Sequence, residues 1–293
     1  MSRPDDVTEG KSSVSTTTLA APPSERLSYA AGVTQPWRRT LIRLVERAMG
    51  VRSLLQLYDA AAREAAEGVD PFLAGKKHLD VQVDIEAGSL DRIPATGPLL
   101  IVSNHPFGAV DGLILCSLVT QVRKDFRILL NHVASQIHEI EPWILPIDFR
   151  PVRESREVNL QSRKKAIELL QEGGCLVLFP AGSIATTETN YGLWGSATER
   201  EWTPFTSRLI LKSQPTVLPI YISGQNSRLF QVASHVSPTL RAALLVREIS
   251  NKKGRRIGVR IGEPIDTTTA DLPSDRQELA DLLQQRTLAL AGD

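Results

Sequence analysis

The chain has 293 residues, of which 42% are apolar and 23% charged, an ordinary balance for a folded globular protein that excludes global disorder. Lysine and arginine number 34 against 33 acidic residues, and the net charge of +1 gives no overall attraction to nucleic acid, so no nucleic-acid partner is expected. The two cysteines, Cys116 and Cys175, lie in apolar runs and are too few for a disulfide framework or a cysteine-based zinc site. We expect neither a metal nor another cofactor.

The first 28 residues predict a disordered tail. They are rich in Ser, Thr and Pro, and they contain no apolar segment of the kind that a signal peptide needs. The sequence shows no run of about 20 uncharged, dominantly apolar residues, so no transmembrane helix is expected. From these features we expect the protein in the cytoplasm.

Residues 29–75 are expected to form a basic amphipathic helical segment. Apolar side chains recur at three- and four-residue steps from Trp37 to Tyr58, and Gly50 is expected to bend or divide the helix. Residues 36–56 hold five arginines and a single acid, Glu46. Such a helix suits peripheral binding to the inner face of the cell membrane. A helix that docks on the protein and leaves its arginines in water has the same pattern.

From residue 98 onward, short apolar runs of β type alternate with helical patterns. Strands are expected at residues 99–103, 126–130, 175–179, 217–222 and 257–261, and helices at 112–122, 155–172 and 274–290. The strands are almost continuously apolar, which indicates burial on both faces. The alternation predicts an α/β domain over residues 76–293, with a mostly parallel central sheet flanked by helices.

Residues 103–112, with the sequence Ser-Asn-His-Pro-Phe-Gly-Ala-Val-Asp-Gly, carry the strongest signal for chemistry. A buried strand leads into His105, a turn follows, and Asp111 lies where the next helix is expected to begin. Active sites of open α/β sheets are built at such strand ends. A carboxylate that hydrogen-bonds an imidazole fixes its tautomer and prepares the other ring nitrogen to accept a proton. The alternative is that His105 only ends a strand and Asp111 only caps a helix.

Four blocks, in this order, resemble motifs of the glycerolipid (1-acylglycerol-3-phosphate-type) acyltransferase superfamily. The Asn-His pair at 104–105, with five residues before Asp111, resembles the first motif in the branch labelled hemolysin-like or ornithine-lipid acyltransferase. Residues 146–150 lie where the second motif is expected, residues 179–183 (Phe-Pro-Ala-Gly-Ser) resemble the third motif, and residues 202–227 resemble the downstream block. The resemblance covers about residues 80–265.

This resemblance implies an O-acyltransferase. Such an enzyme moves a fatty acyl group from an acyl-CoA or acyl-carrier-protein thioester to the hydroxyl of a lysolipid, either a lysophospholipid or a lyso-aminolipid. His105 is then the general base, Asp111 orients it, and backbone N–H groups near the third motif stabilise the oxyanion. The residues that the motifs imply for substrate binding are Asn104, Pro106, Phe107, Gly108, Arg150, Phe179, Pro180, Ala181, Gly182, Ser183 and Pro219.

Two departures from the family pattern concern the acceptor. Ala181 replaces the usual acidic residue of the third motif, and Ile184 stands where many relatives carry a phosphate-binding arginine. The loss of that charge pair disfavours bidentate capture of a lysophosphatidate phosphate. We therefore expect Arg150 or another basic residue to take over, and an acceptor with an amino-acid or other non-phosphatidate headgroup.

Two further interpretations remain open. Residues 181–185 also resemble a nucleophile elbow, which would make Ser183 the nucleophile of a serine hydrolase or esterase with His235 as its base, although residues 186–192 read as loop rather than helix. No aspartate lies between Ser183 and His235, so the acid would have to be Glu188, Glu199 or Glu201. A non-catalytic lipid-binding module needs no His–Asp pair. Among the remaining basic residues, His78 is expected in a solvated turn. The run at 252–256 is expected in a loop between a helix and a strand, and contact with anionic lipid or an acidic carrier protein is the alternative.

Overall fold

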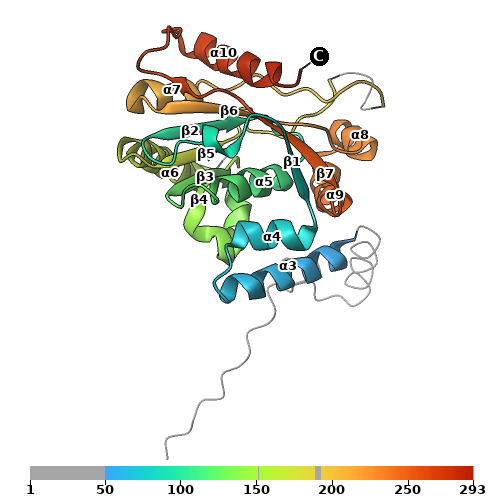
Figure 1. Cartoon of the computed structure of the whole chain (residues 1–293). Coiled ribbons are helices and arrows are strands. Elements are labelled where there is room, and N and C mark those ends of the chain that lie inside the picture. The colour runs from blue at the N-terminus through green and yellow to red at the C-terminus, as the bar shows by residue number, and fades with distance from the viewer. Residues whose placement is uncertain (1–49, 151, 189–192, 293) are drawn as a thin grey trace, which may run out of the picture.

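An eight-stranded sheet forms the centre of the molecule (Figure 1). The computed structural model describes residues 50–150, 152–188 and 193–292. From β6 to β4 all neighbouring strands are parallel, whereas β7 runs antiparallel to β6, so the prediction of a mostly parallel α/β sheet is confirmed. The strands, in their spatial order, are β1 (Gln82–Ala87), β7 (Arg256–Ile261), β6 (Thr216–Ile222), β2 (Leu99–Ser103), β5 (Cys175–Leu178), β3 (Phe126–Asn131) and β4 (Ile144–Ile147), and β8 (Ile265–Asp266) pairs with β6.

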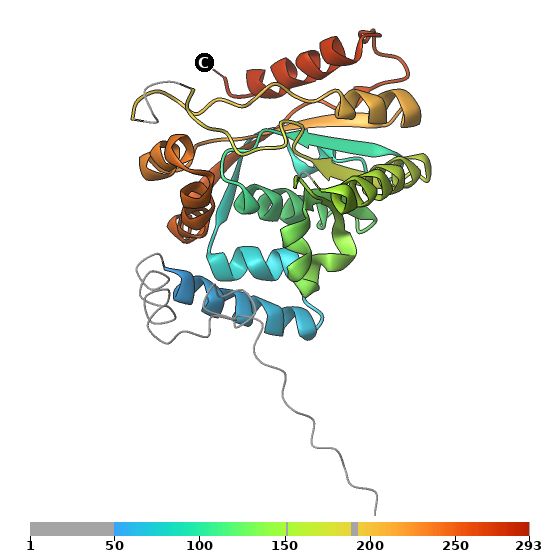
Figure 2. The same cartoon turned by 180° about the vertical axis from the view of Figure 1, so that it is seen from behind.

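Helices cover both faces of this sheet (Figures 1 and 2). One face is covered by α4 (Pro71–Leu79) and α5 (Ala109–Val119), and the other by α6 (Arg153–Gln171), α7 (Phe205–Ser213) and α10 (Arg276–Ala289). The remaining helices are α3 (Val51–Ala66), which packs on α4, and the pair α8 (Arg228–Val236) and α9 (Pro238–Asn251) at one end of the sheet.

The central strand β2 shows why its sequence is apolar throughout. Leu99 and Ile101 belong to the core beneath α4 and α5, while Leu100 and Val102 belong to the core on the opposite face. All four side chains are completely buried. Successive side chains of a strand point to opposite faces, so a strand between two helical layers has no polar face.

The expected elements agree with the structure to within a few residues, but several were missed. The helix expected at 112–122 begins at Ala109, and the one expected at 155–172 begins at Arg153. The expectation for His78 was wrong, because this residue lies in α4 and its Nε2 is 3.0 Å from Oε1 of Glu64. Asp70 starts α4 by accepting the backbone N–H groups of its first turn, and the basic last turn suits the negative end of the helix dipole. The unforeseen elements are β1, β4, β8, α4, α7, α8 and α9.

Most of the N-terminal predictions fall outside the described residues. The tail of residues 1–28 and the arginines up to Arg47 lie in the undescribed segment. A helix, α3, begins directly after Gly50, which adopts a φ of +75°. The helix α4 runs across the boundary expected between residues 75 and 76. Within the described part of the chain, no helix combines the length and the apolar character needed to cross a bilayer.

Candidate active site

His105 and Asp111 are in direct contact at the carboxyl end of β2. Nδ1 of His105 lies 2.9 Å from Oδ2 of Asp111, and the imidazole keeps 16% of its side-chain surface exposed while the carboxylate is completely buried. Because Nδ1 faces a carboxylate, the neutral ring carries its proton on Nδ1 and its lone pair on Nε2. Among the described residues, none hydrogen-bonds Nε2. Nε2 is therefore the ring nitrogen that can accept a proton from a substrate.

Asp111 also caps α5. Its Oδ2 accepts the backbone N–H groups of Phe107 and Gly108, each at 2.8 Å. Gly108 has φ +87° and ψ −123°, which other residues avoid, and a Cβ there would lie 2.8 Å from Cδ1 of Ile184. Asp111 therefore caps the helix and contacts the imidazole at the same time.

The third-motif turn lies against the histidine. Phe179, directly after β5, stacks on the imidazole with ring centroids 4.1 Å apart and 20° between the planes. The N–H of Ala185 donates to the carbonyl of His105 at 2.9 Å. Gly182 is exposed and adopts φ +64°, and its N–H donates to the Phe179 carbonyl at 3.0 Å. The first and third motifs thus form one site, whose accessible side includes Gly182 and the half-buried Ser183, while the buried members of the turn are Phe179, Pro180 and Ala181.

Glu199 enters the same site from the segment before the downstream block. Its Oε1 accepts the backbone N–H of His105, and its Oε2 accepts the indole N–H of Trp202 at 2.8 Å. Burial raises the pKa of the Glu199 carboxyl to about 7, although both hydrogen bonds and the nearby His105 act in the opposite direction.

Asn104 and Pro219 hold the sheet together. The Asn104 amide donates to the carbonyl of Ile222 at 2.8 Å and accepts its N–H at 2.7 Å, so it links β2 to β6 beyond the last backbone pair. Pro219 is buried within β6 opposite Val102, and its carbonyl accepts the N–H of Gly262. Their predicted contact with substrate stays a prediction, as it does for the buried residues Pro106, Phe107 and Gly108.

The second motif brings a charged pair close to the third-motif turn. Arg150 donates from Nε to both oxygens of Asp148 at 3.0 Å and from Nη2 to Oδ2 at 2.7 Å. These hydrogen bonds hold the pKa of the buried Asp148 carboxyl well below its usual range. The Arg150 side chain is 62% exposed. Between the two residues, Phe149 lies 4.0 Å from where a Cβ on Gly182 would be.

A second basic residue lies beside the position of the missing family arginine. Ile184 packs with apolar residues of α8 and α9, including Phe230. Arg241 of α9 donates from Nη2 to the Ile184 carbonyl at 3.1 Å, and its guanidinium lies over the Phe230 ring, 5.6 Å from the centroid. The expected basic substitute therefore has two structural candidates, Arg150 and Arg241.

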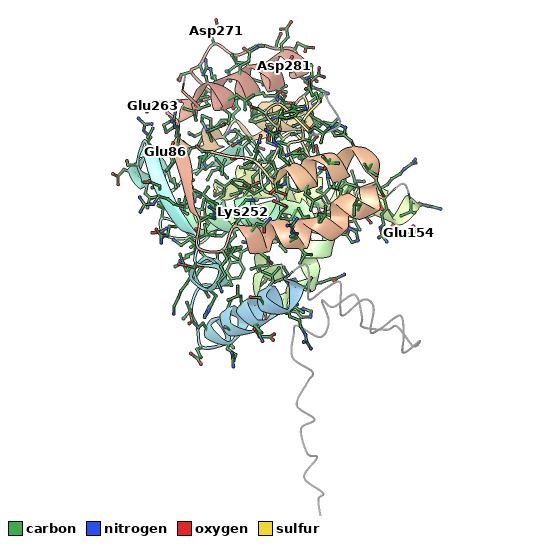
Figure 3. The ribbon with its side chains drawn as sticks, turned by 90° about the vertical axis from the view of Figure 1, so that its right-hand side faces the viewer. Glu86, Glu154, Lys252, Glu263, Asp271 and Asp281 are labelled. Carbon is green, nitrogen blue, oxygen red and sulfur yellow. The ribbon has the colours of Figure 1, made fainter. Side chains whose placement is uncertain are left out.

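The basic run at 252–256 joins α9 to the start of β7, as expected for a loop between a helix and a strand, but Lys252 within it is buried. In Figure 3 Lys252 lies near the centre of the view, whereas Glu154 and Asp271 lie at the outline, and only 9% of the Lys252 surface is exposed. Its Nζ is 4.6 Å from the centroid of the Phe107 ring and 3.3 Å from Oε2 of Glu248, which is only 1% exposed. Burial lowers the pKa of the Lys252 ammonium, and Glu248 opposes that shift.

The parts of a serine-hydrolase site do not come together. Residues 184–188 form no helix after Ser183. Nε2 of His235 lies 2.7 Å from the carbonyl oxygen of Thr187. A nucleophile elbow needs a helix directly after the serine and a base on its hydroxyl, so the geometry does not support Ser183 as a nucleophile.

Comparison with known proteins decides the family. A family model described as acyltransferase matches residues 77–292. The chain belongs to this acyltransferase family. Lyso-glycine lipid O-acyltransferases from Phocaeicola vulgatus and Bacteroides thetaiotaomicron are 25% and 24% identical to it over 70% of this chain, which corresponds to 71% and 73% of the relatives. The crystal structure of the 1-acyl-sn-glycerophosphate acyltransferase from Thermotoga maritima is 16% identical and covers 89% of this chain and 84% of its own, with a TM-score of 0.45.

The resemblance to acyltransferases that the four sequence blocks indicated is thus confirmed, and the protein is an enzyme. The motifs did not mark three charged residues that contact the candidate site: Glu199, Arg241 and Lys252. One signal was available for Glu199, a carboxylate three positions before the strongly apolar Trp202-Thr-Pro-Phe block. The other two lie on α9 and at its end, in a helix that was not foreseen.

Proposed function

We propose that this acyltransferase moves a fatty acyl group from a thioester donor, acyl-CoA or acyl-carrier protein, to the hydroxyl of a lysolipid. The observation that carries the proposal is the contact between His105 and Asp111 beside the accessible turn at Gly182. The names of the two bacterial relatives, both lyso-glycine lipid O-acyltransferases, support O-acylation of a lysolipid.

His105 serves as the general base in this reaction. Its Nε2 takes the proton of the acceptor hydroxyl while the hydroxyl oxygen forms a bond to the thioester carbonyl carbon. The tetrahedral intermediate then breaks its carbon–sulfur bond, and the imidazolium returns the proton to the leaving thiolate. Asp111 stabilises the imidazolium in between. Since the N–H of Gly182 is already bonded to Phe179, the N–H groups of Ser183 and Ile184 are the candidates for holding the oxyanion.

The acceptor carries an amino-acid headgroup in this proposal. With Ala181 and Ile184 in the third motif, the turn itself offers no charge to a phosphate. Arg150 is exposed near the turn and already shares its guanidinium with Asp148, which leaves capacity for a single carboxylate. A glycine or similar amino-acid headgroup presents one such carboxylate, whereas a phosphate monoester carries up to two charges.

Product analysis by mass spectrometry tests this function. The purified full chain is incubated with acyl-CoA or acyl-carrier protein and with lyso-glycine lipid, lyso-ornithine lipid or lysophosphatidate. We expect the diacyl aminolipid product, at least a 100-fold loss of rate for His105→Ala, and unchanged rate for Ser183→Ala. Arg150→Ala should raise KM for the aminolipid, while Arg208→Ala, on the exposed side of α7, should not. Preference for lysophosphatidate overturns the acceptor assignment, and full activity of His105→Ala overturns the mechanism.

We also propose that the α8–α9 end of the molecule binds an anionic lipid bilayer. Arg228 of α8 donates to the carbonyl of Gly195, which joins the loop at 193–196 to this helix pair. Residues 228–247 contain three arginines (Arg228, Arg241 and Arg247) and no lysine, aspartate or glutamate. Basic charge beside exposed aliphatic and tryptophan side chains suits the interface of an anionic membrane. The exposed apolar residues are Leu193, Trp194, Leu229, Val236 and Leu240.

Vesicle sedimentation tests this surface. We expect the protein to bind phosphatidylglycerol vesicles more tightly than phosphatidylcholine vesicles, and Trp194→Ala combined with Leu229→Ala to weaken that binding severalfold. Leu211→Ala, which removes a similarly exposed side chain from α7, serves as the control and should change nothing. Vesicle binding that is unaffected by the double variant, or a surface that binds only acyl-carrier protein, overturns the proposal.

A further inference from the structure

The carboxylate of Glu199 accepts a hydrogen bond from the backbone N–H of His105. We propose that Glu199 is a positioning residue of the acyltransferase: it fixes the backbone of His105, and through Trp202 it ties that backbone to the C-terminal helix α10. The inference rests on the proposed acyl transfer by His105, but the contacts themselves do not depend on it.

The two contacts of Glu199 require a carboxylate. Its partners, the backbone N–H of His105 and the indole N–H of Trp202, are both donors and reach different oxygens. A carboxylate offers two acceptors, whereas a glutamine offers one acceptor and one NH₂ group. In a Glu199→Gln variant one donor must therefore face another donor, and one buried N–H loses its partner.

The peptides around His105 are held by two separate loops. The Glu199 carboxylate accepts the backbone N–H of His105, and the carbonyl of His105 accepts the N–H of Ala185. Both bonds act on the residue whose ring must stay stacked on Phe179 and paired with Asp111. A small rotation of the backbone would shift the imidazole relative to both partners, and such misplacement is costly to catalysis.

Trp202 gives Glu199 a fixed support. The indole is 1% exposed, and the backbone N–H of Trp202 donates to the side chain of Gln284 while its carbonyl accepts from Gln277. Both glutamines belong to α10, and Figure 2 shows the segment after the undescribed residues 189–192 running beside this helix. The C-terminal helix thus fixes Trp202, which positions Glu199 against the backbone of His105.

The charge on Glu199 is sensitive to pH near neutrality. The titratable groups around it are His105, Asp111 and Tyr221. Burial, together with the charge of Asp111, raises the pKa of the Glu199 carboxyl to about 7, and the bonds from Trp202 and His105 lower it. The Glu199 carboxylate is therefore fully ionised, and can accept both hydrogen bonds, only above neutral pH.

Four variants test the proposal. Glu199→Gln should lower kcat about 10- to 100-fold with little change in donor KM, since binding groups stay in place. Glu201→Gln removes the same charge from an exposed neighbour and should keep the wild-type rate. Trp202→Phe removes the second donor, so the double variant Glu199→Gln/Trp202→Phe lets the remaining carbonyl serve the His105 N–H. We expect the double variant to be at least as active as Glu199→Gln alone, a rescue that a purely structural role of either residue does not produce.

Two readouts separate this inference from the proposed function. The pH–rate profile of the wild type should contain an ionisation near pH 7 that Glu199→Gln lacks. The ¹⁵N shifts of the His105 imidazole should show a single Nδ1–H tautomer in the wild type and a mixture in Glu199→Gln, whatever substrate is used. A wild-type rate for Glu199→Gln, or strictly multiplicative losses in the double variant, overturns the positioning role. A wild type that transfers no acyl group to any lysolipid, yet shows the imidazole difference, overturns the proposed function instead.

Discussion

The ammonium nitrogen of Lys252 lies 4.6 Å from the centroid of the Phe107 ring, in the turn that also carries His105. A cation over an aromatic face is favourable, the more so when both are removed from water. Lys252 is at the same time hydrogen-bonded to Glu248 and Asn226, each at 3.3 Å. The first-motif turn therefore rests on a buried ion pair from the end of α9.

Lys252→Met is expected to lower the free energy of unfolding by about 3–5 kcal/mol, because it leaves the buried carboxylate of Glu248 without its cation. Urea denaturation followed by circular dichroism measures the change. Lys253→Met is the matched control: this neighbouring lysine is exposed, and its substitution should cost under about 0.5 kcal/mol. Equal stability of the two variants would contradict the argument.

Asp111→Asn should reduce kcat by about 100-fold while the protein still folds. The remaining carbonyl oxygen can still accept the N–H groups of Phe107 and Gly108, so the start of α5 survives. The same oxygen also faces Nδ1 of His105, so the variant keeps an acceptor there and loses the negative charge that stabilises the imidazolium. Steady-state kinetics and thermal melting on the same samples check this, and a loss of less than tenfold would count against the pairing.

Two glycines of the site should respond differently to alanine. Gly108→Ala combines a forbidden φ/ψ with a Cβ 2.8 Å from Ile184, and we expect destabilisation of about 3 kcal/mol or more together with inactivity. Gly182→Ala places its Cβ in ordinary contact, with only Phe149 at 4.0 Å, and φ +64° alone costs about 1 kcal/mol. Chemical denaturation of the two variants measures the difference, and the reverse order would refute the packing at Gly108.

Glu199 should make the wild type less stable as the pH rises from about 4.5 to 7. In this range the unfolded chain has lost the proton of Glu199, whose ordinary pKa is 4.5, while the folded protein, with a pKa of about 7, retains it. The folded state therefore binds more protons, and stability falls with pH by up to about 1.4 kcal/mol per unit. Unfolding of wild type and Glu199→Gln across this range measures the contribution as the difference between their slopes. Parallel slopes would contradict the raised pKa.

The pairing of His105 with Asp111 was predictable because both residues belong to one short segment. A strand, a turn and the first turn of a helix fix their separation, and no other part of the chain is needed to bring them together. The same holds for β2, β5 and the closing helix, whose patterns are continuous and whose positions agree with the structure to within two residues.

The roles of Glu199 and Lys252 were not predictable in this way. Glu199 is separated from His105 by 94 positions, and its carboxylate reaches the site because Trp202 is anchored on α10. Lys252 stands in a basic run that was expected to be a loop, and its burial depends on how α9 packs beside the first-motif turn. Contacts of this range follow from the arrangement of whole elements, which local patterns do not contain.

The complete burial of β2 has a consequence for how the enzyme fails when it is heated. The strand that leads into His105 has no exposed side chain between Leu99 and Val102, and it lies in the middle of the sheet. Segments of this kind exchange their amide hydrogens only through cooperative opening of the entire domain. Turnover should therefore persist up to the melting transition and vanish with it, rather than fade ahead of it.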